Sequence, residues 1–572
     1  MTFPHSAFPV PVPVPAPPHP PVSYGPPAPV LHPVPVPPGG VEVRPVAPPV
    51  PAVPTEAFAP ARPVLVPEAE PVRIGVDNNR CRIYGICQQE APEVFRVSEG
   101  GSLHYTRGVP AELAAQARQA VRCCPMQAIT IHGGQTPGGA PMGGGRADRR
   151  PLRSGAASRT GRRRVVVAGA GLAGLSAATR LRERGFDGEL VIVGEERQRP
   201  YSRPPLSKQY LSGALTDSQL TFRADESLDA HWLLGTPVIG LDMHRKALEL
   251  RGGERLPYDG LVLATGVDAR RLPEAPLFTD RIRTVRTLGD AAAVRQAMLA
   301  ARARHVVIVG GGFVGCELAC TARDQGMDVT LVVHSAPLLR RVLGARVGAV
   351  VADLQREAGV ALRLGTRITD WQDHGDALRL GLTTGEMLTC DFVVLGLGSE
   401  PRTEWLRGSG VEISDGVLCA PTTHVRDVHG RIVPHIVAAG DVASWPNARF
   451  DERPRRVEHL IHAVEMGQHA ADALLQGPGR AARFTPVPRF WSEQHGVRIQ
   501  AAGIPSLGSD VEITEGSLRS GRFLARYTRP TAYGPQIVGA VAFDMPLRLL
   551  DYRDQIGRTR ARPPTVHRGR HR

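Results

Sequence analysis

Lysine is nearly absent from this chain of 572 residues, because only Lys208 and Lys246 among its 69 basic residues are lysines. Cysteine is also scarce, and eight cysteines in this length exclude a disulfide scaffold. The longest apolar stretches, such as residues 165–178, are interrupted by glycines and fall short of the roughly 20 residues that a membrane span requires. The start of the chain lacks a basic segment followed by an unbroken apolar one, so we expect a cytoplasmic protein without a membrane span.

The formal net charge of +14 could suggest a nucleic-acid partner, but most of it is confined to two segments. Residues 133–164 contain eight arginines and one aspartate, and residues 557–572 contain six arginines and no acid. Aromatic residues, which single-strand binding uses for stacking, do not alternate with these arginines. The charge therefore predicts solvated segments and no specific nucleic-acid site.

Proline and glycine divide the chain into folded and unfolded parts. Proline alternates with valine and alanine in residues 1–70, which favours an extended polyproline II arm, a spacer or alternatively a ligand for a proline-binding domain. Residues 134–161 form a glycine-rich flexible linker with an expected reach of about 30 Å. That reach would let the preceding domain, residues 71–133, move between the rest of this chain and an external partner. Residues 557–572 form a basic tail.

The first glycine-rich turn, Gly169-Ala170-Gly171-Leu172-Ala173-Gly174, lies in the context that a dinucleotide site needs. A β-branched strand (164–168) precedes it, and a helix (172–184) and a second strand (190–193) follow. Glycines at these positions let the backbone approach a pyrophosphate at the helix N-terminus. Glu195 follows the second strand, where an acid accepts hydrogen bonds from the adenosine ribose.

A second turn of the same type, with Gly310, Gly312 and Gly315, follows the strand 305–309 and predicts a second dinucleotide site. After the next strand (329–333), the position of the ribose-binding acid is occupied by His334. The missing acid weakens the case for NAD over NADP, because a neutral or basic residue tolerates a 2′-phosphate better.

Three cysteines near the N-terminal end have the spacing of an iron–sulfur site. Cys81 and Cys87 flank Tyr84, which stands where a C-x2-C-x2-C run has its middle cysteine, and Cys124-Pro125 follows a helix. Cys123 is interpreted as a packing residue. Zinc is the alternative for clustered cysteines, but zinc sites usually present closer pairs and a fourth protein ligand.

Residues 162–552 resemble the oxygenase-coupled ferredoxin reductases, within the pyridine nucleotide-disulfide reductase-like family. The motifs that carry the resemblance occur in the family's order, at residues 199–208, 264–266, 438–442, 456–459 and 490–494. True disulfide reductases of the family have a redox cysteine pair that residues 179–215 lack.

The resemblance implies a role for individual residues. It places Arg203 and Lys208 along an FAD, pairs Lys208 with Glu317 and sets Trp491 near the isoalloxazine. A positive charge there stabilises the anionic reduced flavin. The remaining cofactor-binding residues that it implies are Gly266, Gly440, Asp441 and His459. The other cysteines, Cys316, Cys320, Cys390 and Cys419, are interpreted as small buried apolar residues.

Residues 72–133 resemble the small actinobacterial ferredoxins that deliver electrons to haem-thiolate (cytochrome P-450 type) monooxygenases. The match includes Ala91-Pro92-Glu93-Val94-Phe95. It implies that Cys81, Cys87 and Cys124 hold a 3Fe-4S cluster, with 4Fe-4S as the alternative.

The expected fold is multidomain: a small α+β ferredoxin domain, two α/β Rossmann-like domains for FAD and NAD(P), and a small α+β C-terminal domain. The expected boundaries are 71–133 for the ferredoxin domain, 162–277 and 401–475 for the FAD domain, 278–400 for the NAD(P) domain and 476–556 for the C-terminal domain. We expect an enzyme that passes electrons from NADH or NADPH through FAD to its own cluster and on to an oxygenase. The alternatives are an NAD(P)H oxidase or quinone- or disulfide-reducing flavoenzyme with a sensing cluster, and a redox-controlled binding protein.

Overall fold

The computed structural model describes residues 70–133 apart from 99, and residues 163–557 apart from 223–227, 277–278 and 301–303. All of them belong to one unit of the fold, 55–572. The expected arm, linker and basic tail lie outside the described residues, except for residues 70 and 557 at their boundaries. Within the described ranges, no helix is both long enough and apolar enough to cross a bilayer.

The N-terminal domain contains two small sheets and two helices. One sheet has the order β4-β1-β5, with β1 (Val72–Val76), β4 (Gly108–Val109) and β5 (Ile129–His132), and the other pairs β2 (Phe95–Val97) with β3 (Leu103–Tyr105). The helices are α1 (Ile86–Glu90) and α2 (Ala114–Cys123), the latter preceded by the 3-10 turn η1 (Ala111–Leu113). Small alanines on one face of α2 pack against Phe95 and Val72.

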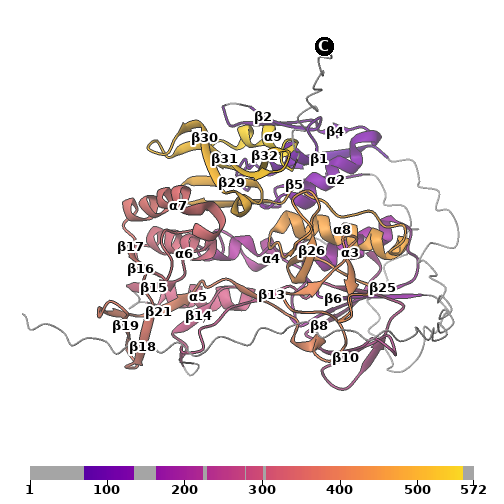
Figure 1. Cartoon of the computed structure of the whole chain (residues 1–572), viewed down its shortest axis with the longest axis horizontal. Helices are drawn as coiled ribbons and strands as arrows, with labels where there is room; N and C mark the ends of the chain where they lie inside the picture. Colours follow the sequence, from indigo (N-terminus) through magenta and orange to yellow (C-terminus); the bar gives the residue numbers. More distant parts are fainter. Residues whose placement is uncertain are drawn as a thin grey trace, which may run out of the picture. The chain divides into compact units, whose positions relative to one another are not determined.

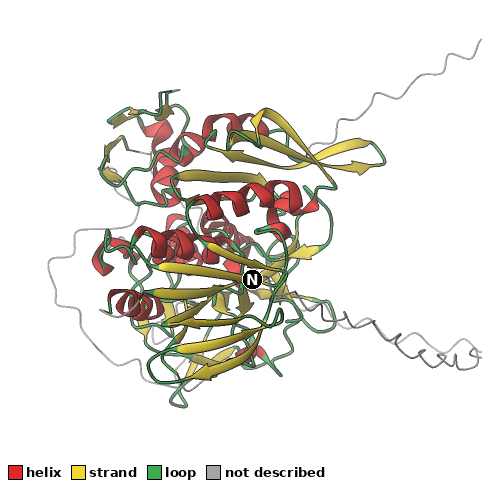
Figure 2. Cartoon of the chain, turned by 90° about the vertical axis from the view of Figure 1, so that its left-hand side faces the viewer, coloured by secondary structure: helices red, strands yellow, loops and turns green. Residues whose placement is uncertain are grey.

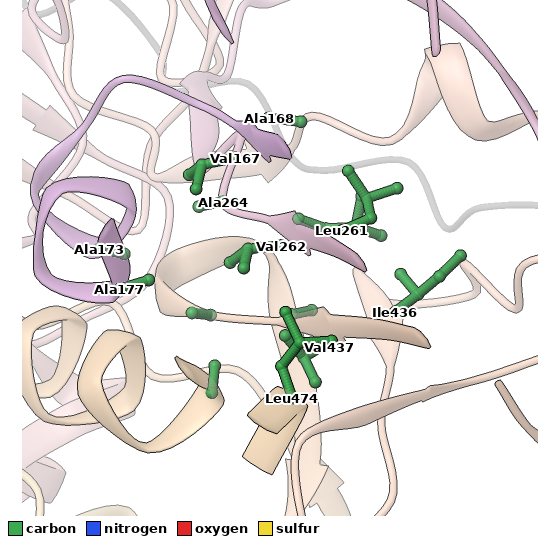
Figure 3. Packing of buried hydrophobic residues seen from close by; sticks show 14 of the residues in the cluster. Val167, Ala168, Ala173, Ala177, Leu261, Val262, Ala264, Ile436, Val437 and Leu474 are labelled. Carbon is green, nitrogen blue, oxygen red and sulfur yellow. The ribbon is translucent and has the colours of Figure 1, made fainter. Parts of the chain in front are cut away.

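The first nucleotide-binding region is built on a six-stranded sheet of order β24-β25-β12-β6-β7-β8. Its strands are β24 (His424–Arg426), β25 (Ile432–Ala438), β12 (Gly260–Leu263), β6 (Arg164–Ala168), β7 (Glu189–Gly194) and β8 (His231–Leu234). Helices α3 (Leu172–Glu183) and α8 (Leu460–Gln476) pack on the sheet. Val167, Ala177, Val262, Val437 and Leu474 are fully buried between them (Figure 3).

The second region repeats this architecture on a parallel five-stranded sheet of order β14-β21-β15-β16-β17. Its strands are β14 (Ile282–Thr284), β21 (Phe392–Leu395), β15 (His305–Val309), β16 (Asp328–Val333) and β17 (Ala361–Leu364), and its helices are α5 (Leu288–Leu299), α6 (Phe313–Asp324) and α7 (Arg340–Glu357). Figure 2 shows these layers of helix and strand. The sequence-based strands at 305–309 and 329–333 correspond to β15 and β16.

Smaller sheets connect and extend the two regions. They comprise β9 (Val238–Asp242), β10 (Ala247–Leu250) and β11 (Arg255–Pro257); β13 (Val267–Ala269) with β22 (Ser399–Pro401); β18 (Ile368–Asp373), β19 (Leu378–Leu382) and β20 (Met387–Cys390); and β23 (Val417–Leu418), β26 (Ala443–Pro446) and β27 (Pro454–Arg455). Short helical turns occur at η2 (Pro204–Ser207), α4 (Asp217–Leu220), η4 (Glu404–Leu406), η5 (Gly440–Val442) and η6 (Pro505–Leu507).

The C-terminal region is an antiparallel five-stranded sheet of order β28-β29-β32-β31-β30 followed by α9 (Pro546–Arg553). The strands are β28 (Arg489–Gln494), β29 (Val497–Gly503), β30 (Asp510–Ser517), β31 (Arg522–Thr531) and β32 (Gly534–Phe543). The indigo N-terminal elements lie beside this yellow sheet and α9 in Figure 1. Side chains of this region donate to backbone carbonyls of the N-terminal elements, among them Gln500 Nε2 to Tyr84 O (2.8 Å) and Arg553 Nη1 to Gln89 O (2.8 Å).

Candidate active site

The first glycine-rich turn has the shape that a pyrophosphate requires. A Cβ on Gly169, whose φ is +123°, would lie 2.1 Å from Ala264 O, and one on Gly174 would lie 2.0 Å from Gly169 O. A Cβ on Gly171, by contrast, would meet no atom within 4 Å. Gly171 is the N-cap of α3, so the turn is tight behind the helix N-terminus and open in front of it.

The second turn repeats this geometry at the start of α6. A Cβ on Gly310 (φ +116°) would lie 2.3 Å from Gly396 O, and one on Gly315 would lie 2.0 Å from Gly310 O. The position at Gly312, the N-cap of α6, is open. His334 lies directly after β16 and is exposed.

A cavity of about 560 Å³ extends from the first turn to the C-terminal sheet. Of the residues implied by the sequence, it is lined by Gly169, Gly171, Glu195, Arg203, Lys208, Gly266, Glu317, Asp441, His459 and Trp491. Gly174 and Gly440 lie behind the lining, where Gly440 (φ +74°) packs against Ala173. Phe313 and Val314, from the start of α6, also line the cavity, so the second nucleotide turn opens towards the first site.

Arginines and acids are paired around the cavity. Arg203 binds Glu196 at 2.6 Å, Arg286 binds Asp441 at 2.9 Å, and Arg402 binds Glu195 at 2.8 Å. Burial of His459 lowers the pKa of its imidazole to about 4, so the ring is neutral at pH 7. Its buried Nδ1 has no hydrogen-bond partner among the described residues, which leaves it free for a ligand group.

Lys208 and Glu317 meet at one wall of the cavity. Lys208 Nζ lies 2.6 Å from Glu317 Oε2, and only 5% of Glu317 is exposed. Ser207 donates to the same oxygen at 2.6 Å, and Ser492 donates to Oε1 at 2.7 Å. Three donors therefore fix the carboxylate, which in turn orients the ammonium group. Both serines lie within the motifs at residues 199–208 and 490–494, but the sequence assigned neither of them a role, because a hydroxyl has no distinctive spacing.

Cys81, Cys87 and Cys124 line a second, smaller cavity in the N-terminal domain. Burial, followed by the proximity of Cys124 and Cys81, raises the pKa of the Cys87 thiol to about 12. Among the described residues the lining contains no histidine, aspartate or glutamate that could serve as a fourth zinc ligand. The three thiols and their apolar surroundings therefore fit an iron–sulfur cluster better than zinc.

Cys123 is not among the residues that line this cavity. It is completely buried and packs against Ile461 and Val464 of α8. The expectation that the four other cysteines are all buried apolar residues holds for three of them. Cys316, Cys390 and Cys419 are buried, but the interpretation of Cys320 as a buried apolar residue is wrong, because it is only partly buried and has polar partners.

Tyr84 lies between the two cavities. Its ring centroid is 5.8 Å from that of Trp491, at an interplanar angle of 43°, and its hydroxyl donates to Glu493 Oε2 at 2.9 Å. Only 5% of Tyr84 is exposed, and burial raises its pKa above the usual range. The sequence identified Tyr84 only as the residue in place of a cysteine, and gave no sign of its contact with Trp491.

A buried ion-pair cluster holds the two regions together beside this contact. Arg489 of β28 pairs with Glu90 of α1 and with Glu465 of α8, each at 2.5 Å. The side chains of Arg489 and Glu90 are 6% and 7% exposed. Both carboxylates depend on this guanidinium, since a buried charge without a partner is costly.

Comparisons with known proteins agree with this geometry. Residues 163–467 match the family described as pyridine nucleotide-disulphide oxidoreductase, and residues 76–131 match the 4Fe-4S single cluster domain of ferredoxin I. Putidaredoxin reductase CamA of Pseudomonas putida is 34% identical, covering 64% of this chain and 85% of its own length. The ferredoxin–NAD(+) reductase component of the biphenyl dioxygenase system of Paraburkholderia xenovorans is also 34% identical. This match covers 63% of this chain and 85% of the relative's length.

Solved structures give the same result. The covalent putidaredoxin reductase–putidaredoxin complex matches with a TM-score of 0.62 and 30% identity, covering 68% of this chain and 92% of the matched chain. A NAD-dependent persulfide reductase from A. fulgidus matches with a TM-score of 0.60 at 20% identity, covering 69% and 76%, which shows a shared fold.

Proposed function

The chain belongs to the pyridine nucleotide-disulphide oxidoreductase family, and from this we propose that it is an NADH-dependent ferredoxin reductase of an oxygenase system that contains its own ferredoxin domain. It takes electrons from NADH at an FAD site, passes them to an iron–sulfur cluster in residues 71–133, and delivers them to an oxygenase. We further propose the division into ferredoxin, FAD, NAD(P) and C-terminal domains at the boundaries given above.

The contact between Tyr84 and Trp491 carries this proposal. Trp491 lines the larger cavity, and Tyr84 belongs to the loop that supplies Cys81 and Cys87. At this point the two cavities are therefore separated only by the aromatic pair of Tyr84 and Trp491. A reductase with a sensing cluster has no need of this arrangement, whereas an intramolecular electron path requires the two sites to be close.

The larger cavity fits FAD. The open position at Gly171 accommodates a pyrophosphate, and His459 offers a neutral nitrogen without a protein partner. When bound, FAD converts the electron pair of a hydride into single electrons. Lys208 supplies positive charge at the cavity wall, Glu317 holds it in place, and Trp491 closes the side towards the ferredoxin domain. No cysteine lines the cavity among the described residues, which argues against disulfide reduction.

Three thiols favour a 3Fe-4S cluster over the 4Fe-4S type in the ferredoxin domain. Tyr84, in place of the middle cysteine, directs its hydroxyl to Glu493, so it does not replace the missing ligand. Iron content and the electron paramagnetic resonance signal of the oxidised protein distinguish the two clusters. Three irons per chain and a signal in the oxidised state support 3Fe-4S, and four irons with a silent oxidised state would contradict it.

We propose NADH as the preferred nucleotide, by analogy with relatives named as NAD(+) reductases. The open position at Gly312 is where its pyrophosphate would bind, and His334 is exposed at the end of β16. A ratio of kcat/KM that favours NADPH would overturn this choice. His334→Glu should increase the preference for NADH, because an acid accepts the ribose hydroxyls and repels a 2′-phosphate.

We propose a haem-thiolate monooxygenase as the acceptor. Cys81 and Cys87 stay partly exposed, and Arg82, which also lines their cavity, is exposed. The cluster site is therefore reachable from solvent while the ferredoxin domain contacts the reductase. Steady-state turnover with a purified haem-thiolate monooxygenase tests the acceptor, and turnover only with another class of oxygenase would contradict it.

Anaerobic rapid mixing with NADH tests the central proposal. Flavin bleaching should be followed by cluster bleaching at a rate that does not change on dilution, because both sites belong to one chain. A cluster that stays oxidised while the flavin is reduced would favour the oxidase alternative.

A further inference from the structure

One group of potential metal ligands lies outside both cavities. Cys320 and Asp324 are one turn apart at the end of α6, and His495 is in the turn between β28 and β29. One ligand atom from each residue lies within 4.8 Å of the other two. Cys320 Sγ donates to Asp324 Oδ2 at 3.6 Å and accepts from the backbone N–H of His495 at 3.1 Å. The group thus converges on the sulfur atom.

The imidazole of His495 is anchored from behind by a buried amide. His495 Nε2 lies 3.1 Å from Gln355 Oε1, and Gln355 is completely buried. Gln355 Nε2 donates to two carbonyl-type oxygens, Cys316 O at 3.2 Å and Gln494 Oε1 at 3.1 Å. The amide orientation is therefore fixed, and its oxygen faces His495.

Further hydrogen bonds continue in the same direction to Glu317, at the wall of the larger cavity. Gln494 Nε2 donates to Ser492 Oγ at 3.1 Å, and Ser492 donates to Glu317 Oε1 at 2.7 Å. Since Glu317 is paired with Lys208, its carboxylate is a fixed acceptor at the end of this chain. Each donor therefore points away from His495 and towards Glu317.

This polarity determines the tautomer of His495. An amide oxygen can only accept a hydrogen bond, so His495 Nε2 carries the proton and Nδ1 has the lone pair. A histidine that donates its other ring N–H to a fixed acceptor is the usual arrangement behind a metal ligand. Cys320, Asp324 and His495 would supply three of the four tetrahedral ligands of zinc, and a water molecule would supply the fourth.

We propose that Cys320, Asp324 and His495 bind a thiophilic divalent cation such as Zn²⁺. Binding forms a bond from the metal to Cys320 Sγ and releases the thiol proton to solvent, without any change in oxidation state. Asp324 is exposed, so the ion can enter from solvent. Glu493 adds negative charge near Cys320, while Arg323 adds positive charge near His495.

Zinc binding to the intact, cluster-loaded flavoprotein tests the site. Competition with a chelator should show one high-affinity zinc per chain that Cys320→Ser and His495→Asn each abolish. Zinc-edge X-ray absorption should show one sulfur at about 2.3 Å with nitrogen and oxygen ligands at about 2.0–2.2 Å. Gln355→Met should weaken zinc binding by about 10- to 100-fold, as expected for a residue that orients a ligand.

Two controls separate this site from adventitious binding. His374→Asn removes an exposed histidine elsewhere and should leave the affinity unchanged. The flavin and iron content of each variant shows whether it has folded. Zinc affinity that is unaffected by both Cys320→Ser and His495→Asn, or a zinc coordination sphere without sulfur, would overturn the proposal.

Discussion

The ring of Tyr84 in the cysteine loop lies 5.8 Å from the ring of Trp491, while its hydroxyl binds Glu493 at 2.9 Å. One residue of the ferredoxin domain thereby contacts two residues of β28: its ring lies against Trp491, which lines the reductase cavity, and its hydroxyl binds Glu493. Aromatic residues buried in this way contribute strongly to interfaces. The pair is the basis of the first prediction.

Tyr84→Ala should weaken the contact between the ferredoxin domain and the reductase by about 2 kcal/mol or more and slow cluster reduction. Tyr84→Phe is the matched control, because it keeps the ring beside Trp491 and loses only the hydrogen bond to the Glu493 carboxylate, about 1.5–3 kcal/mol. Flavin and cluster bleaching are followed separately by stopped-flow absorbance. Equal rates of cluster bleaching in Tyr84→Ala and the wild type would show that the aromatic pair is not part of the path.

Arg489→Met should release the ferredoxin domain, because it leaves Glu90 and Glu465 buried without their cation, at a cost of about 3–5 kcal/mol. Hydrogen exchange in α1 should increase and cluster reduction should slow. Arg122→Gln removes a more accessible pair with Glu183 and should cost about 1 kcal/mol or less. Similar exchange in both variants would refute the special role of Arg489.

Lys208→Ala should slow flavin reduction by NADH and lower the flavin potential by on the order of 30 mV or more, since about 1.4 kcal/mol corresponds to 30 mV for two electrons. The charge beside the cavity is lost, and Glu317 keeps its two serine donors but loses its cation. Lys246→Ala, which changes the chain's other lysine at an exposed position, is the control. An unchanged potential in Lys208→Ala would mean that the lysine does not act on the flavin.

Cys81→Ser, Cys87→Ser and Cys124→Ser should each lose iron and keep FAD, because these thiols line one cavity. Cys123→Ser should retain the iron, since Cys123 packs against α8 instead. Metal analysis after anaerobic purification measures the result. Zinc in place of iron, or full iron in Cys124→Ser, would contradict the assignment of the ligands.

His462→Phe should make the protein more resistant to acid. His462 stacks on Trp445 with ring centroids 4.7 Å apart, and neither of its ring nitrogens has a hydrogen-bond partner among the described residues. Burial, together with the nearby His459, lowers the pKa of His462 to about 3. Between this value and the unfolded value of about 6.5, the unfolded chain binds more protons, so stability falls as the pH drops below 6.5.

Removing this titration should stabilise the variant relative to the wild type by about 2 kcal/mol at pH 5. At pH 8 that contribution is absent. Melting temperatures of the holoprotein at the two pH values provide the measurement, with His374→Asn as an exposed-histidine control. A stability difference that is the same at pH 5 and pH 8 would show that His462 does not titrate on unfolding.

Local signals allowed the nucleotide turns to be predicted from the sequence. The strand, glycine turn and helix at Gly169 and Gly310 follow from periodicity and backbone freedom over about 30 residues. The structure places β6, α3, β15 and α6 at these positions. The spacing of Cys81 and Cys87 is equally local, because a single loop brings them to one cavity.

Only the tertiary structure decided which side chains from distant segments meet. Tyr84 and Glu493 are 409 positions apart, and Arg489 is 399 positions from Glu90. Nothing in the chemistry of a lone tyrosine, glutamine or histidine identifies its partner before the sheets and helices pack. The sequence thus determined where nucleotides could bind and which thiols could hold a cluster. Packing determined the aromatic contact between the two cavities and placed the buried amides behind His495. These contacts depend on burial and orientation, which local residue patterns do not encode.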